Sequence, residues 1–257
     1  MTQTRSKMSH QPSASPPSLS LPTTTTAAST STMSPATTPS NPDLTHFLTH
    51  PWCAALLSAP DTTLLPTPSR VPKESTEDSF FAITLRTGDT IPYMLSFSSP
   101  RPSDGVVADA ATDPSAPPLA PGIGTEQVST LFALGDALNG YPTTAHGGLI
   151  AALFDEAMGV SMMRLRSSAA NPKCPLAGTD IVTASLKVDF VRRLATPGVV
   201  VVRVWVAERR GRKWVLEGEM LGVGEGGEGE GGNGWWGGRG GFGWRCGLVC
   251  KGGGGCF

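Results

Sequence analysis

Two adjacent carboxylates, Asp155 and Glu156, lie in the middle of an almost wholly apolar segment that runs from about Gly147 to Arg166. The spacing of its apolar residues predicts one long helix that is buried on nearly all sides. A buried carboxylate without a partner is energetically costly. Acids in such a helix therefore indicate a function, and a carboxylate in this setting could activate water.

A His-Gly-Gly sequence, His146 to Gly148, stands at the predicted start of the same helix. Backbone N–H groups at a helix start form a natural site for negative charge. They could hold the oxygen of a polarised carbonyl while water attacks its carbon. The helix start and the carboxylates together predict hydrolysis at a carbonyl group.

The fourteen residues from His146 to Gly159 resemble the motif of the hotdog-fold thioesterases. They are most similar to the phenylacetate-type acyl-CoA branch, in which an Asp follows nine residues after the His; here that Asp is Asp155. The resemblance extends from about Ser79 to Leu221. It implies an α+β hotdog fold, in which a curved antiparallel sheet wraps around a long central helix. It also implies a thioester hydrolase that acts on acyl-CoA without a cofactor.

The resemblance implies a role for each matched residue. Asp155 would be the general base or nucleophile, with Glu156 as the alternative acid, because related branches use a helix Glu. The amide of Gly147 would bind the oxyanion. His146 would orient the loop or the thioester, and Thr183 would hold the water. Gly148 would contribute to the substrate site.

The length of the predicted helix bears on the oligomeric state. Asp155 lies ~13 Å along the helix from His146, at ~1.5 Å per residue, so one subunit cannot easily supply both to one thioester. In the family the Asp comes from the opposite protomer. The resemblance therefore implies a homodimer or a homotetramer.

Each candidate also has a structural alternative. Asp155 could be a paired structural acid, His146 a loop residue before the helix, and Thr183 an ordinary strand residue. The two glycines could serve close packing alone.

Three more residues could bind substrate. Many relatives carry Asn or Gln six residues before the motif His, where this chain has Gly140. Asn139 could bind the carbonyl instead, or it could simply form a turn with Gly140. Arg192 and Arg193 could bind the phosphates of coenzyme A, or they could be solvated charges at a strand end.

Two other function classes remain open. One is a non-catalytic acyl-ligand binder or inactive relative, and the other is a hotdog hydratase, which would need a second His beside its Asp. The net charge of −1 gives no nucleic-acid footprint. The sequence has no long apolar run, so no membrane span is expected. Its irregularly spaced cysteines and four His predict no metal site.

The first 42 residues contain ten Thr, ten Ser and seven Pro but no acid. This composition predicts a disordered tail. A cytoplasmic protein is expected, with a mitochondrial address as the alternative because the tail is Ser-rich and acid-free. Residues 43–76 should form a helix capped by Asp43 and broken at Pro51, followed by a linker.

Residues 77–221 form the predicted hotdog domain. A long surface loop is expected at 100–124 and a shorter one at 135–145. Runs of β-branched and alternating apolar residues predict its strands: Ser79–Arg86, Thr90–Ser98, Glu126–Leu134, Asp180–Val191, Val199–Glu208 and Lys213–Leu221.

The last segment, 222–257, does not fit this domain, because 18 of its 36 residues are Gly. Glycine at that density disfavours a strand, so the final strand of the family is expected to be missing. The abrupt change of composition is typical of a translated intron or a shifted reading frame. A genuine Gly-rich tail is the alternative, and the first hypothesis would leave the chain poorly folded or inactive.

Overall fold

The computed structural model describes residues 41–101, 125–167, 180–210, 213–222 and 244–253 of one unit, Ser40–Phe257. Most of the predicted tail 1–42 and most of the predicted loop 100–124 lie outside the described residues. Residues 223–243 and 254–257 of the Gly-rich segment also lie outside them. Within the described residues, no helix is both long enough and apolar enough to span a membrane.

Two short helices, α1 (Pro42–Leu48) and α2 (Pro51–Leu57), open the described chain. The break at Pro51 is confirmed, but the predicted cap is wrong. Asn41 caps α1, because its Oδ1 accepts from the amides of Asp43 at 3.0 Å and Leu44 at 3.2 Å. The carboxylate of Asp43 instead accepts from the amide of Met94 at 3.1 Å, which ties α1 to the sheet.

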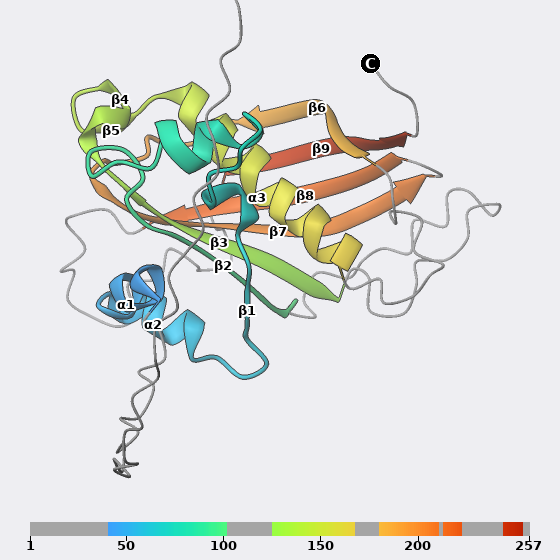
Figure 1. Cartoon of the computed structure of the whole chain (residues 1–257), viewed down its shortest axis with the longest axis horizontal. Helices are drawn as coiled ribbons and strands as arrows, with labels where there is room; N and C mark the ends of the chain where they lie inside the picture. Colours follow the sequence, from blue (N-terminus) through green and yellow to red (C-terminus); the bar gives the residue numbers. More distant parts are fainter. Residues whose placement is uncertain (1–40, 102–124, 168–179, 211–212, 223–243, 254–257) are drawn as a thin grey trace, which may run out of the picture. The chain divides into compact units, whose positions relative to one another are not determined.

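One antiparallel sheet forms the body of the unit, with the strand order β1-β2-β3-β7-β8-β9-β6. β1 and β6 are its edges (Figure 1). Its strands are β1 (Thr63–Leu65), β2 (Met94–Pro100), β3 (Glu126–Leu134), β6 (Asp180–Asp189), β7 (Gly198–Arg210), β8 (Lys213–Gly222) and β9 (Trp244–Gly253).

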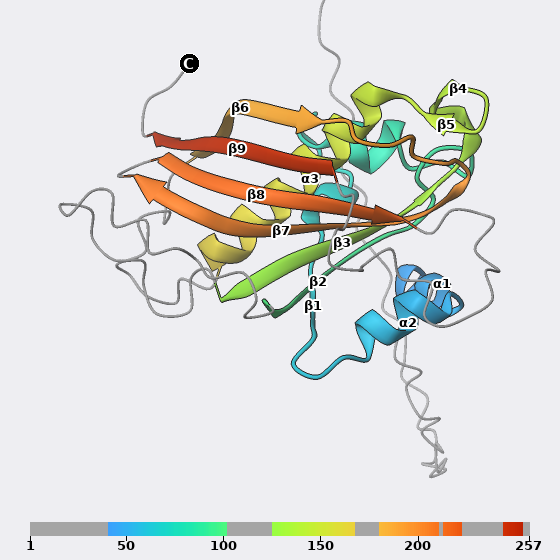
Figure 2. The same ribbon diagram turned by 180° about the vertical axis from the view of Figure 1, so that it is seen from behind.

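The helix α3 (Gly147–Ser167) lies across one face of this sheet (Figure 1). Its residues Leu153 and Phe154 are fully buried in the main core, together with Phe132 of β3. Successive strand residues face opposite sides, so the neighbouring Leu131 packs into a second cluster, with Phe47 of α1. The helices α1 and α2 therefore cover the face of the sheet opposite α3, which Figure 2 shows from behind. The α+β hotdog fold is confirmed.

Two of the expected strands differ in the structure. Residues 79–86, which were expected to form a strand, contain a π-helical turn, η2 (Phe80–Thr84). Phe81, Ala82 and Leu85 are buried, so the apolar residues follow a helical spacing rather than an alternating one. The next strand begins at Met94 rather than Thr90. The 3₁₀ turns η1 (Pro68–Arg70) and η3 (Asp136–Leu138) and the short strands β4 (Asn139–Tyr141) and β5 (Thr144–Ala145) complete the elements.

The prediction that the final strand is missing is wrong. β9 pairs with β8 on one side and with β6 on the other, so it completes the sheet within the predicted tail. Only three of its ten residues are Gly, whereas the tail as a whole is half Gly. The high average glycine content of the tail does not apply to this local segment, which can form a strand.

Candidate active site

The start of α3 is held by the side chain of His146. The amide of Gly148 donates to His146 Nδ1 at 2.9 Å, so the imidazole caps the helix. A Cβ at Gly148 would lie 3.0 Å from the same nitrogen, which explains the glycine. The amide of Gly147 donates to no described residue. It is the available N–H group at this helix start.

The loop before α3 packs directly on the same histidine. A Cβ at Gly140 would lie 3.0 Å from the Cα of His146, so a larger residue does not fit there. The Oδ1 of Asn139 accepts from the hydroxyl of Thr196. The short strands β4 and β5 hold this loop.

The segment after β6 also runs beside the helix start. The amide of Ala145 donates to the carbonyl of Leu194 at 2.9 Å. A Cβ at Gly147 would lie 3.4 Å from the ring of Phe190, which is 58% exposed. Arg192 and Arg193 follow Phe190 in the chain and are exposed. The structure thus places both arginines in the segment that borders the helix start.

Asp155 lies two turns further along α3, on the side that faces β6. Its side chain is exposed although Leu153 and Phe154 beside it are fully buried. The hydroxyl of Thr183 on β6 donates to Asp155 Oδ1 at 2.7 Å. Thr183 therefore contacts the carboxylate itself, whereas the resemblance implied that it would hold the water. This bond fixes one carboxylate oxygen and leaves Oδ2 without a described partner.

Glu156 points away from Asp155 and contacts a different part of the chain. The hydroxyl of Ser69 in η1 donates to Glu156 Oε1. Burial raises the pKa of Glu156; the negative charges of Asp78 and Asp155 raise it further, while the Ser69 hydrogen bond and Arg70 oppose the shift. The two adjacent acids are therefore in different environments, and no pattern in the sequence indicated the contact with Ser69.

The pKa shift of Glu156 makes the stability of the protein depend on pH. A carboxyl whose pKa is raised in the folded state stabilises the fold at low pH, and this contribution is lost as the pH rises through the folded-state pKa. Below the ordinary value of 4.5, Glu156→Gln should have the unfolding free energy of the wild type. At about pH 8 the variant should be more stable. Urea unfolding at both pH values measures the difference.

Glu74→Gln is the matched control, because Glu74 is exposed and lies in the segment after η1, which carries Ser69. Because this substitution removes no buried contact, the unfolding free energy of the control should stay within about 0.5 kcal/mol of the wild type. A Glu156→Gln variant that is less stable than the wild type at high pH would contradict this account of the burial of Glu156.

Residues 143–224 match the family model described as the thioesterase superfamily. This segment is therefore similar to proteins of that superfamily. The match includes the helix start, both carboxylates, Thr183 and the two arginines, whereas Asn139 lies outside it.

Verlamelin biosynthesis protein B from Lecanicillium sp is 30% identical to this chain over 138 residues, 48% of this chain and 55% of that protein. The chain thus spans about half the length of this relative.

Solved structures with a similar fold include a hypothetical thioesterase protein with coenzyme A from Streptococcus pneumoniae TIGR4 (15% identity, TM-score 0.35, 50% of this chain and 79% of that chain). Another is the Escherichia coli PaaI protein from the phenylacetic acid degradation operon (14% identity, TM-score 0.35, 50% and 74%). A third is smu.793 from Streptococcus mutans UA159 bound to acetyl CoA (14% identity, TM-score 0.36, 53% and 86%).

Proposed function

We propose that this chain hydrolyses an acyl-CoA thioester to a free acid and a thiol, with Asp155 as the general base. The observation that carries the proposal is the Asp155–Thr183 pair. Here the acid is exposed at the edge of the sheet, and Thr183 orients it so that a second oxygen can bind water.

In the proposed reaction, Asp155 takes a proton from the bound water, and the water oxygen attacks the thioester carbonyl carbon. The carbonyl electrons move to the oxygen, which the Gly147 amide stabilises. When the carbonyl re-forms, the carbon–sulfur bond breaks. The sulfur leaves as a thiol after it receives the proton that Asp155 holds.

We further propose that the two halves of this site come from two subunits. Gly147 and Asp155 are separated by eight residues of α3, ~12 Å at ~1.5 Å per residue. Attack on a bound carbonyl requires the base and the oxyanion donor within hydrogen-bond reach of one thioester. β6 is an edge strand with several exposed side chains beside Thr183, and an edge strand is a ready surface for pairing with another chain. A two-fold dimer through this edge would bring a partner's helix start to Asp155.

Arg192 and Arg193 are the proposed contacts for the phosphates of coenzyme A. They follow Phe190, whose ring lies at the helix start. Phosphate binding by arginine uses paired N–H donors. The coenzyme would then lie over the start of α3, with its thioester reaching toward the partner's Asp155.

The test is thiol release from a panel of short, medium, long and aromatic acyl-CoAs, run beside hydration of an enoyl-CoA. Thiol release with at least one acyl group, and no hydration, is the expected result. Hydration without thiol release would assign the chain to the hydratases. A folded chain that binds the thioesters but releases no thiol would instead be an acyl-ligand binder.

A further inference from the structure

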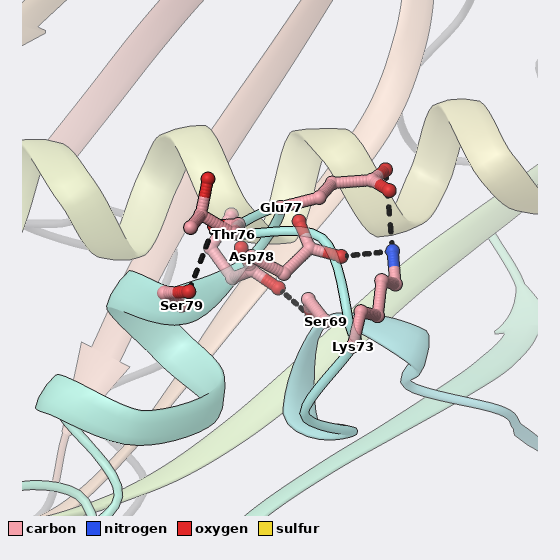
Figure 3. Close-up of polar contacts among 7 residues, drawn as sticks. Ser69, Lys73, Thr76, Glu77, Asp78 and Ser79 are labelled. Atoms are coloured by element: carbon pink, nitrogen blue, oxygen red, sulfur yellow. Dashed lines mark hydrogen bonds and ion pairs between the residues drawn. The ribbon is translucent and has the colours of Figure 1, made fainter. Parts of the chain in front are cut away.

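A cleft of about 180 Å³ lies between α3 and residues 68–78, which we call the strap. The strap begins with η1 and runs along α3 (Figure 3). It lies outside the segment that matches the family model. The walls of the cleft come from the strap, from one side of α3 and from β6.

Polar contacts within and around the strap hold it in place. Lys73 Nζ pairs with Glu77 at 3.2 Å and with Asp78 at 2.5 Å, as Figure 3 shows. The hydroxyl of Ser69 donates to Glu156 on α3. Lys73 is thus paired with two carboxylates, so the rim has an excess of negative charge and is not suited to an anionic ligand.

The inner surface of the cleft is mainly apolar. Val160 and Met162 of α3 are buried there, and Met163 is exposed. Small-molecule pockets are typically lined by apolar side chains with a few polar groups. Methionine side chains adapt readily to flexible ligands. This lining is suited to an aliphatic chain.

The cleft begins close to the proposed catalytic pair, both on α3, which carries Asp155, and on β6, which carries Thr183. Gly159, which lines the cleft, lies four residues after Asp155 and so on the same side of α3. Ile181, which also lines it, lies two residues before Thr183 and so on the same face of β6. The mouth of the cleft is thus about one helical turn, ~5.4 Å, from the carboxylate.

Gly159 keeps that mouth open. A Cβ built at this position would meet no atom within 4 Å. Glycine inside a helix is unfavourable relative to residues such as leucine, so its occurrence in the middle of α3 is not explained by helix stability. The open space at Gly159 is available to a ligand.

We propose that the acyl chain of the substrate enters this cleft, so that the strap and Gly159 select medium-length aliphatic acyl groups over acetyl. The inference rests on the proposed function for the identity of the ligand. An acetyl group ends at the catalytic pair and does not reach the strap. Each further methylene that enters the cleft exchanges water for an apolar wall and strengthens binding.

The experiment compares the binding of two non-hydrolysable thioethers, S-ethyl-CoA and S-octyl-CoA, by titration calorimetry with the full chain. The wild type should bind the octyl compound at least about tenfold more tightly than the ethyl compound. Gly159→Leu, which fills the mouth with a good helix former, should weaken octyl binding and so remove this preference. Gly88→Leu is the matched control, because Gly88 is equally open but lies outside the cleft; it should keep the preference.

Equal binding of the two thioethers by the wild type, or a preference that persists in Gly159→Leu, would overturn the inference. Because the readout is binding, it is separate from turnover. Thiol release without a chain-length preference would leave the proposed function standing and reject the cleft. A preference that Gly159→Leu removes, in a chain that releases no thiol, would support the cleft and reject the hydrolase.

Discussion

Asp155→Asn should lower kcat for thioester hydrolysis by about 10³-fold, within the range that general base catalysis contributes. Asparagine cannot accept the proton of the attacking water. Its Oδ1 can still accept from Thr183, so the contact between α3 and β6 should persist. Because the side chain is exposed, folding should be unaffected. Thiol release and circular dichroism of the same sample measure the two properties.

Glu156→Gln is the comparison that separates the two adjacent acids. Glu156 faces Ser69 and the strap, so its neutral isostere should retain kcat for the best substrate within about tenfold. If Glu156→Gln rather than Asp155→Asn abolished thiol release, the base would have to be assigned to Glu156, and the role of the Thr183 contact would be refuted.

Arg70→Met should lower the free energy of unfolding by about 3 kcal/mol, because it leaves buried carbonyl groups without donors. Arg70 is only 7% exposed. Its guanidinium donates to the carbonyls of Phe81 at 2.9 Å and Ile91 at 2.8 Å. These bonds join the strap to the turn η2 and to the residues before β2. Urea unfolding followed by circular dichroism gives the change.

Arg86→Met is the matched control for this variant. Arg86 also hydrogen-bonds the strap, since its guanidinium donates to the carbonyl of Arg70 at 2.7 Å, but its side chain is exposed. Water can replace an exposed partner, so a loss below about 1 kcal/mol is expected. Equal losses in the two variants would show that burial of Arg70 does not anchor the strap.

The central helix and the strands that flank it could be predicted because their apolar spacing is long and regular. α3 was expected at 147–166 and lies at Gly147–Ser167, and β3 has its expected bounds. Two elements escaped prediction for opposite reasons. Residues 79–86 have strand-forming residues, but Phe81 and Leu85 pack one turn apart in η2. β9 is strand-forming only locally, inside a glycine-rich segment.

The candidate site was only partly predictable. Asp155 could be found because an acid in an apolar helix is locally anomalous. The resemblance pointed to Thr183, but only the structure shows that its hydroxyl contacts the carboxylate. The partner of Glu156 is 87 residues away, in a Pro-containing segment that the sequence indicated only as a linker. Contacts of that separation depend on tertiary packing and have no local signal.

The measurement that tests the central claim most directly is complementation between two inactive subunits. Gly147→Pro removes the proposed oxyanion donor at a helix position that tolerates proline, and Asp155→Asn removes the base. A heterodimer with one variant in each subunit, isolated through two different tags, should recover about half of wild-type thiol release, because one of its two sites combines an intact Asp155 with the partner's intact amide. A heterodimer as inactive as both parent variants would contradict a site shared between subunits.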